Sequence, residues 1–460
     1  MNRFSFTRVV VAAGLLAVTA LGQAGLVVAA ETKPNILFFL ADDLGWRDLG
    51  CYGSKFYESP TLDRLATSGI RFTNAYTAAT VCSPTRASIV TGQTPARHGC
   101  TNYGGSIDPS EHFTLANALR EGGYQTFFAG KWHIGNTTPA AEGFSVVAEE
   151  SARGIDRAND PKSTRSITAN TLAFLKQTNP EKPFFAYVNY HAVHTPLRER
   201  ADLIAKYQTK LAAHPPKSHG PAGLEKERDR DNKQVQDDPA FAAMVEGLDT
   251  SISAILDALA ADGRDQNTIV IFYSDNGGLS TKPCTSNLPL RAGKGWAYEG
   301  GIRVPLIVRW PGRIKPGVAC DVPVTSMDFY PTLLEVAGLP LRPAEHVDGL
   351  SLLALLTEGK APPRTTLYWH YPHYHGAGCT PVGAMREGSY KLVHWYGTDS
   401  YELFDLSKDL SELNDISSAE PELLDRLVRK LTAWQKSFPD LKYDNPNKFK
   451  KRTPRKKRAS

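Results

Sequence analysis

The stretch NILFFL, residues 35–40, is almost entirely apolar and is followed directly by Ala41, Asp42 and Asp43. An unbroken apolar run of this length is typical of a strand that is buried on both faces of a sheet. Further runs of the same character predict strands at residues 124–128, 184–189, 268–273 and 304–309.

The segments between these runs carry helical spacing of their apolar residues, so strands and helices alternate along the chain. The predicted helices lie at residues 60–68, 114–121, 166–177 and 240–261. This alternation predicts an α/β fold in which helices sandwich a large, mainly parallel sheet.

From about residue 362 the pattern changes to short aromatic-rich runs, at residues 367–371, 390–396 and 401–404, followed by a helical segment at 421–436. We expect a smaller antiparallel sheet covered by one helix. The predicted organisation is therefore a catalytic α/β domain over 31–360, a C-terminal α+β subdomain over 361–444 and a basic tail over 445–460.

The first 30 residues have the pattern of a signal peptide. Arg3 and Arg8 precede an apolar stretch at 9–21, and small residues at 28–30 resemble a cleavage site. A membrane anchor is the alternative, but polar and glycine residues interrupt the apolar stretch and no second span follows. The sequence thus predicts a secreted or periplasmic protein rather than an integral membrane protein.

The formal net charge of +5 is concentrated in a basic tail, KFKKRTPRKKR, at residues 448–458. Such a tail binds polyanions or is a solvated, disordered end. The tail has one aromatic residue and no recognisable nucleic-acid-binding module, so nucleic acid is not an expected partner. The chain has six cysteines, and their pairing stays open.

One of these cysteines opens the stretch CSPTRASIVTGQ, residues 82–93. Pro84 suits the first turn of a helix, so we expect Cys82 at a helix N-terminus, where backbone N–H groups favour anions. Arg86, about one turn later, can point back to the same place. A buried or disulfide-bonded cysteine is the alternative.

Polar side chains follow the predicted strands where each strand ends. Asp42 and Asp43 follow the first strand, and Asp275 and Asn276 follow the fourth. The remaining strand-end groups are Lys131 with His133, and His191 with His194. Because open α/β sheets bind ligands beyond the carboxyl ends of their strands, we expect these groups to meet at one site.

With Cys82, Pro84 and Arg86 at these offsets, the chain resembles the type I, formylglycine-dependent sulfatases of the alkaline-phosphatase superfamily. The resemblance runs from about residue 35 to 405 and weakens beyond 349. It implies that a formylglycine-generating maturation enzyme converts Cys82 to 3-oxoalanine (formylglycine), and that the protein hydrolyses sulfate esters. One departure is Thr85, where many members have serine.

The resemblance also implies one divalent cation per subunit, Ca²⁺ rather than Mg²⁺. Its ligands would be Asp42, Asp43, Asp275, Asn276 and modified Cys82, which are hard oxygen donors of the kind calcium prefers.

The same resemblance assigns roles to the remaining polar groups. Arg86 would hold the formylglycine hydrate, and Lys131 and Lys294 would neutralise the sulfate oxygens. His133 would accept a proton as sulfate leaves, and His194 would stabilise the leaving alcohol.

Two other functions stay open: hydrolysis of phosphoric or phosphonic esters, and non-catalytic binding of sulfated glycans. Export favours a sulfated saccharide as substrate. A segment dense in aromatic rings and imidazoles offers stacking surfaces and hydrogen bonds for sugars, or else packs on the main domain. Its candidate substrate-binding residues are Trp369, His370, Tyr371, His373 and His375.

Overall fold

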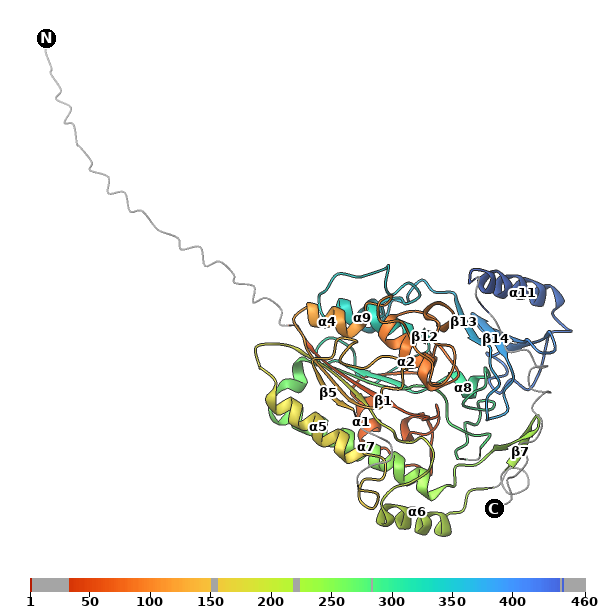
Figure 1. Cartoon of the computed structure of the whole chain (residues 1–460), viewed down its shortest axis with the longest axis horizontal. Coiled ribbons are helices and arrows are strands. Elements are labelled where there is room, and N and C mark those ends of the chain that lie inside the picture. Colours follow the sequence, from red (N-terminus) through yellow and green to blue (C-terminus); the bar gives the residue numbers. More distant parts are fainter. Residues whose placement is uncertain (2–32, 150–155, 218–223, 283, 439–440, 442–460) are drawn as a thin grey trace, which may run out of the picture. The chain divides into compact units, whose positions relative to one another are not determined.

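The computed structural model describes Met1 and residues 33–149, 156–217, 224–282, 284–438 and 441 (Figure 1). Residues 33–460 form one compact unit, and residues 1–32 form a separate unit of which only Met1 is described. The predicted signal peptide and basic tail lie outside the described residues. Everything below concerns the compact unit.

The large sheet has eight strands in the order β11-β2-β10-β9-β1-β6-β4-β5. Its core is parallel, because β1 pairs in parallel with β9 and β6, and β4 pairs in parallel with β6 and β5; β10 runs antiparallel to β9 and β2. The strands are β1 (Asn35–Ala41), β2 (Ile70–Phe72), β4 (Gln125–Gly130), β5 (Val146–Glu149), β6 (Phe184–Asn189), β9 (Thr268–Ser274), β10 (Leu306–Arg309) and β11 (Val318–Cys320).

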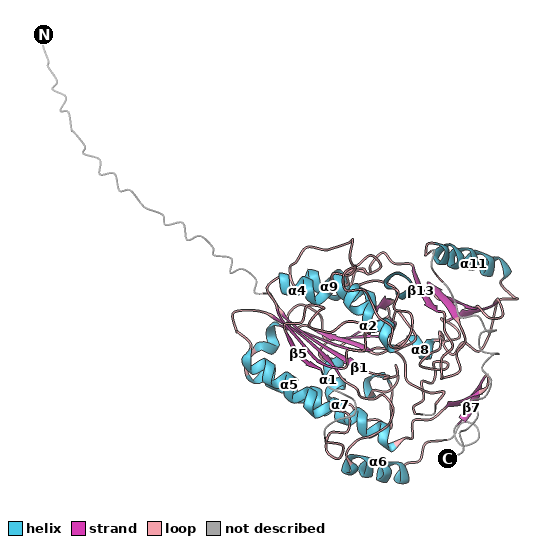
Figure 2. Cartoon of the chain, in the orientation of Figure 1, coloured by secondary structure: helices cyan, strands magenta, loops and turns pink. Residues whose placement is uncertain are grey.

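Helices cover both faces of this sheet, as Figure 2 shows. Successive side chains of a strand point to opposite faces. Ile36 and Phe38 of β1 therefore pack on one side, with α2 (Cys82–Thr91), α4 (Leu115–Glu121), α9 (Phe329–Val336) and α10 (Leu353–Glu358). Leu37 and Phe39 pack on the other, with α1 (Pro60–Thr67), α5 (Thr164–Gln177), α6 (Ala201–Ala213) and α7 (Pro239–Ala261). The predicted α/β sandwich is confirmed.

A second sheet of four antiparallel strands, in the order β13-β14-β15-β16, follows in the chain. The strands are β13 (Thr366–Tyr371), β14 (Val382–Glu387), β15 (Tyr390–Trp395) and β16 (Ser400–Asp405). One face packs against Leu427 and Leu431 of α11 (Pro421–Lys436), and the other packs against Trp296 and Tyr298 of the main body. The predicted antiparallel sheet with one covering helix is confirmed.

Short elements complete the unit. They are η1 (Gly50–Tyr52), β3 (Ala75–Tyr76), α3 (Pro95–His98), β7 (Leu224–Glu227), β8 (Arg230–Lys233), η3 (Arg264–Asn267), α8 (Glu299–Ile302), β12 (Val324–Thr325) and η4 (Ser326–Asp328). The hairpin β7–β8 lies in a charged stretch whose composition suggests a surface loop.

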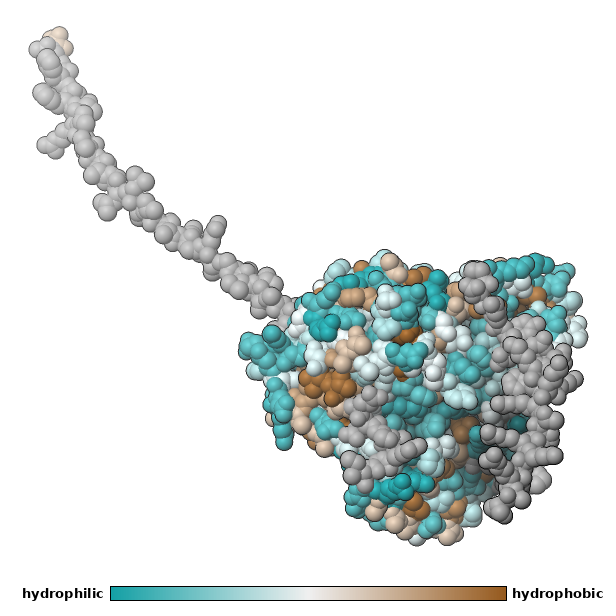
Figure 3. All heavy atoms as spheres, in the orientation of Figure 1, coloured by the Kyte–Doolittle hydropathy of each residue, from teal (hydrophilic) through white to brown (hydrophobic). Residues whose placement is uncertain are grey.

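All six cysteines are unpaired. Of the helices in the described part of the chain, none has the length and apolarity needed to span a bilayer. The face drawn in Figure 3 is mainly hydrophilic, and its apolar groups lie in separate patches.

Candidate active site

The strand-end residues meet at the carboxyl edge of the large sheet. Asp42 and Asp43 follow β1, Asp275 follows β9, and backbone hydrogen bonds join these ends: Asp275 donates to Ala41 and Asp42 donates to Ala192. Because β9, β1, β6 and β4 are parallel neighbours, their carboxyl ends lie at one edge. The sequence-predicted gathering of polar groups is therefore what the topology produces.

Cys82 is the first residue of α2 and is buried. Its Sγ lies 3.2 Å from His133 Nδ1. Burial raises the pKa of the thiol, although Lys131 and Lys294 oppose this rise. The encoded thiol is therefore held protonated at neutral pH at the positive end of a helix.

Arg86 lies one turn along α2 and points into the site. Its Nε and Nη2 lie 2.9 and 2.8 Å from Asp275 Oδ2. Its Nη1 donates to the backbone carbonyl of Lys131 at 2.6 Å and to Asn189 Oδ1 at 3.2 Å. Burial disfavours the charge, but Asp275 and Asp42 outweigh it and raise the pKa of Arg86. The guanidinium thus ties α2 to the ends of β9, β4 and β6.

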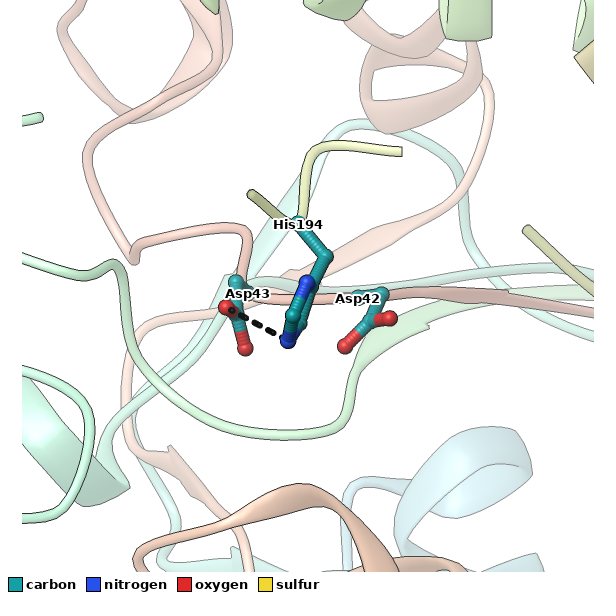
Figure 4. A group of neighbouring side chains, drawn as sticks. All are labelled: Asp42, Asp43 and His194. Atoms are coloured by element: carbon teal, nitrogen blue, oxygen red, sulfur yellow. Dashed lines mark ion pairs between the residues drawn. The ribbon is translucent and has the colours of Figure 1, made fainter. Parts of the chain in front are cut away.

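Asp42, Asp43 and His194 form a group whose ligand atoms all lie within 4.8 Å of one another, a geometry that could hold a metal ion. Figure 4 shows the three side chains pointing to the same side. Lys131 Nζ lies 2.5 Å from Asp42 Oδ2, and Lys294 Nζ lies 2.5 Å from Asp43 Oδ1.

Burial would raise the pKa of both carboxyl groups, but the neighbouring cations prevail. Lys131, followed by His194, holds the pKa of Asp42 well below its usual range. Lys294, followed by His194, lowers that of Asp43. Both carboxylates are therefore ionised at neutral pH.

Asn276 joins this group, because its Nδ2 donates to Asp43 Oδ1 at 2.8 Å. Three oxygen atoms here are buried without a hydrogen-bond partner among the described residues: Asp42 Oδ1, Asp43 Oδ2 and Asn276 Oδ1. An unsatisfied buried acceptor costs about 1–3 kcal/mol, so each such atom needs an explanation. Hard oxygen donors that converge with free lone pairs fit a cation such as calcium.

Asp275 differs from these groups because its oxygens are in use. Oδ1 accepts from the backbone N–H of Asp43 at 3.2 Å, while Oδ2 faces Arg86. Burial, followed by the charge of Asp42, raises the pKa of Asp275 to about 6. A nearby cation would favour the ionised form.

The two candidate catalytic histidines sit in different environments. Burial, reinforced by Lys131 and Arg86, lowers the pKa of His133 to about 3, so this imidazole is neutral and can accept a proton. His194 places Nδ1 2.6 Å from the carbonyl oxygen of Thr195. A carbonyl only accepts, so Nδ1 carries the hydrogen, and Nε2 lies 3.8 Å from Asp43 Oδ2. The His194 side chain is 34% exposed, which leaves one edge open to a substrate.

Lys162 and Asn189 are polar residues of the site that the sequence analysis missed. Lys162 is buried and donates to the backbone carbonyl of His194. Its burial lowers its pKa to about 8, although Asp42 opposes this. Asn189 ends β6 and accepts from Arg86. Position at a strand end was a usable signal for Asn189, whereas Lys162 precedes α5 in no recognisable motif.

The structure separates the five candidate substrate-binding residues. Trp369 and Tyr371 are buried on the face of β13 toward the main body, where Trp369 Nε1 donates to the carbonyl of Thr77 at 2.7 Å. His370 faces the opposite way, 2.7 Å from the hydroxyl of Tyr396, which also accepts from Gln435 of α11.

The other two candidates lie in the half-buried loop after β13. His373 Nε2 lies 3.0 Å from Thr101 Oγ1. His375 packs on Gly295, where an added Cβ would come within 2.2 Å of its Nδ1. Gly295 follows Lys294, so His375 is the member of the segment that approaches the charged site most directly.

A model of the sulfatase family matches residues 34–339 of this chain. The chain belongs to the sulfatase family. It is a sulfuric ester hydrolase of the alkaline-phosphatase superfamily, as the resemblance predicted. A second model, described as the C-terminal part of N-sulphoglucosamine sulphohydrolase, matches residues 292–437.

Two curated relatives illustrate the similarity. A sulfatase of Formosa agariphila is 32% identical over 94% of this chain and 94% of its own. N-acetylgalactosamine-6-sulfatase of Canis lupus familiaris is 31% identical over 85% of this chain and 76% of its own.

Solved structures also resemble this sulfatase. Ps i-CgsB in complex with k-i-k-neocarrahexaose gives a TM-score of 0.74 at 26% identity, over 91% of this chain and 96% of that chain. The structure of a second protein, in complex with its substrate D-glucosamine-2-N,6-O-disulfate, gives a TM-score of 0.76 at 23% identity, over 89% of this chain and 99% of that chain. The phosphonate monoester hydrolase of Agrobacterium radiobacter gives a TM-score of 0.70 at 20% identity, over 88% of this chain and 96% of that chain. The last two show likeness of fold alone.

Proposed function

We propose that this sulfatase removes sulfate from sulfated saccharides, using a formylglycine made from Cys82 and a bound calcium ion. The observation that carries the proposal is the position of Cys82. It opens a buried helix N-terminus beside His133, in a site that also holds Arg86 and Lys294. A helix N-terminus and fixed cations around one side chain favour an anionic ester and its developing charge.

When formed, the formylglycine hydrate supplies one hydroxyl to attack sulfur and a second whose deprotonation expels sulfate. A bound calcium ion supplies Lewis-acid polarisation of a sulfate oxygen. Asp42, Asp43, Asp275 and Asn276 would hold this ion together with the modified side chain.

The encoded side chains supply the remaining steps. Lys131 and Lys294 neutralise the sulfate oxygens, and Arg86 orients the group at position 82. His133 is neutral and lies 3.2 Å from Cys82 Sγ, so it is placed to accept the proton that leaves with sulfate elimination. His194, whose side chain is 34% exposed and whose Nε2 lies 3.8 Å from Asp43 Oδ2, stabilises the leaving alcohol oxygen.

A saccharide substrate is supported by the relative named N-acetylgalactosamine-6-sulfatase and by the similar structure in complex with k-i-k-neocarrahexaose. Secretion or export to the periplasm is supported by the signal-peptide pattern of residues 1–30, and it fits an extracellular glycan. Residues 31–360 would form the catalytic domain and residues 361–444 the subdomain that borders the substrate.

The test is to coexpress the chain with a formylglycine-generating enzyme and to measure hydrolysis of 4-nitrophenyl sulfate and 4-nitrophenyl phosphate. We expect the sulfate ester to be the better substrate, peptide mass spectrometry to show formylglycine at position 82, and Cys82→Ser to be nearly inactive. A preference for phosphate would favour the phosphoric or phosphonic ester hydrolase instead. Full activity with unmodified Cys82 would overturn the proposed nucleophile.

A further inference from the structure

Tyr103 is an aromatic side chain that the assigned chemistry does not use. It is 59% exposed, whereas the other Phe, Trp and Tyr side chains of the described residues are buried or half-buried. A single exposed aromatic residue needs no explanation by itself. The contacts around Tyr103, however, indicate a function for this residue.

The loop that carries Tyr103 is tied to two parts of the reaction centre. Gly104 donates its backbone N–H to Ser83 Oγ at 2.8 Å, and Ser83 is the neighbour of Cys82. Gly135, two residues after His133, donates to the carbonyl of Gly105 at 2.8 Å. These bonds fix the loop relative to both Cys82 and His133.

A third tie reaches the second sheet. The hydroxyl of Tyr371 donates to Asn102 Oδ1 at 3.0 Å, and the backbone N–H of Tyr103 donates to the same oxygen at 2.8 Å. Tyr103 therefore sits where the loop after α3 meets the histidine-rich segment after β13. The loop around Tyr103 is thus held through Asn102, Gly104 and Gly105, while the ring of Tyr103 stays open to solvent.

The ring of Tyr103 lies near the ring of His375. Its centroid lies 6.3 Å from that of His375, with an angle of 80° between the planes. His375 rests on Gly295, next to Lys294. The two rings thus form an edge-to-face pair that begins beside Gly295, the neighbour of the buried Lys294, and ends at the exposed ring of Tyr103.

We propose that Tyr103, with His375 behind it, is a stacking platform for the pyranose ring of the substrate. This inference rests on the proposed function, because it names the part of the site that recognises the sugar rather than the sulfate. The apolar C–H face of a sugar packs on an aromatic ring, and such a ring has no fixed charge with which to attract sulfate. The cations of the site already meet the sulfate group, so recognition of the sugar requires an uncharged surface of this kind.

The test compares Tyr103→Ala, Tyr103→Phe and Tyr103→Trp in formylglycine-containing full-length protein. The probes are sulfated disaccharides prepared from heparin, chondroitin sulfate and carrageenan, with the best wild-type substrate used for the variants. Inorganic sulfate serves as a competitive inhibitor that has no ring. Leu341→Ala, which alters an exposed apolar side chain elsewhere, is the matched control.

For Tyr103→Ala we expect kcat/KM on the disaccharide to fall about tenfold or more, mainly through KM, and the Ki of inorganic sulfate to stay within about twofold. Tyr103→Phe and Tyr103→Trp should retain most of the activity, because they keep the ring. Wild-type-like kinetics of Tyr103→Ala, or an equal loss of sulfate affinity, would overturn the platform. A wild-type enzyme that hydrolyses 4-nitrophenyl sulfate but no disaccharide would also overturn it, whereas failure on 4-nitrophenyl sulfate itself would count against the proposed function.

Discussion

Lys294 Nζ lies 2.5 Å from Asp43 Oδ1, and both side chains are buried. Asn276 Nδ2 donates to the same oxygen at 2.8 Å, while Asp43 Oδ2 has no hydrogen-bond partner among the described residues. Oδ1 of Asp43 is thus paired with Lys294 and Asn276, whereas Oδ2 is available to a further ligand. The arrangement allows one carboxylate to hold a cation and at the same time to position the ammonium group that we propose meets sulfate.

Replacing Lys294 should therefore have two separable effects. We expect Lys294→Ala to lower kcat/KM by about 10²–10³ for every sulfate ester, because a preorganised positive group facing the sulfate oxygens is lost. We also expect a lower Tm without calcium, since removing one partner of a buried ion pair strands the other charge. Calcium should recover part of the lost Tm by compensating Asp43. Lys315→Ala, at an exposed lysine between β10 and β11, should leave both quantities unchanged.

Calcium itself should stabilise the protein. After treatment with a chelator, added CaCl₂ should raise Tm by a few degrees and restore activity, because a ligand that binds only the folded state stabilises it in proportion to ln(1 + [L]/Kd). Magnesium should do so less well, since it demands a stricter octahedral geometry.

Matched variants make this measurement specific. Asp43→Asn should abolish most of the calcium-induced shift, and Asp257→Asn, at a remote position on α7, should keep it. Full turnover in protein shown to be metal-free would rule the site out.

Much of the fold follows from the sequence because the central strands are buried on both faces. Their unbroken apolar runs are unambiguous, and the structure extends the predicted runs of β1 and β9 by only one residue each. The missed strands β2, β5 and β11 of the large sheet are three or four residues long, too short to produce a pattern. The six-residue strand β14 of the second sheet was also missed, because its sequence VGAMRE has no aromatic or continuous apolar run. The antiparallel pairing of β10 depends on contacts with β9 and β2, which a local pattern does not encode.

The site residues also fall into those that the sequence could predict and those that it could not. Asp42, Asp43, Asp275 and Asn276 could be predicted together because strand ends of a parallel sheet meet. Lys162 could not, because it reaches His194 through a backbone carbonyl from a loop without a motif.

The candidate substrate-binding residues at 369–375 could be predicted only in part. The period of two along a strand already separates His370 from Trp369 and Tyr371. The position of Tyr103 near His375 depends on long-range contacts, and a local sequence pattern does not contain them.

A buried charge cluster beside the second sheet predicts a pH dependence of stability. Lys391 is fully buried, with Nζ 3.0 Å from Glu299 Oε1 and 2.7 Å from Glu412 Oε1. Burial raises the pKa of Glu412 to about 7; Lys391 opposes the rise and the charge of Glu299 adds to it. For Glu299, Lys391 and Arg303 outweigh the burial and lower the pKa to about 2.

The ordinary pKa of glutamate is 4.5, so between about pH 4.5 and 7 the folded protein retains a proton on Glu412 that the unfolded chain has lost. The stabilising contribution of this proton is full below pH 4.5 and is lost as pH rises through about 7. We expect Glu412→Gln, which stays neutral, to show a smaller fall in Tm between pH 5 and pH 8 than the wild type. Identical falls would show that Glu412 does not titrate in this range.

The last prediction concerns Lys162 and the leaving group. Its buried ammonium donates to the carbonyl of His194, and this bond helps to hold the loop that presents the His194 imidazole. General acid assistance contributes about 10²–10⁴ in rate where the leaving alcohol is poor, and little where it is good. A misplaced His194 should therefore slow the release of a sugar alcohol much more than the release of 4-nitrophenol.

We accordingly expect Lys162→Met to reduce kcat on a sulfated saccharide by about tenfold or more, and kcat on 4-nitrophenyl sulfate by less than about threefold. His194→Ala should show the same discrimination more strongly, and Lys162→Arg should recover part of the loss because it keeps a charged donor. Lys182→Met, at an exposed lysine, is the control for charge removal. Equal losses on the two substrates would mean that Lys162 supports the fold rather than the position of His194, since a smaller fraction of folded enzyme cannot distinguish one leaving group from another.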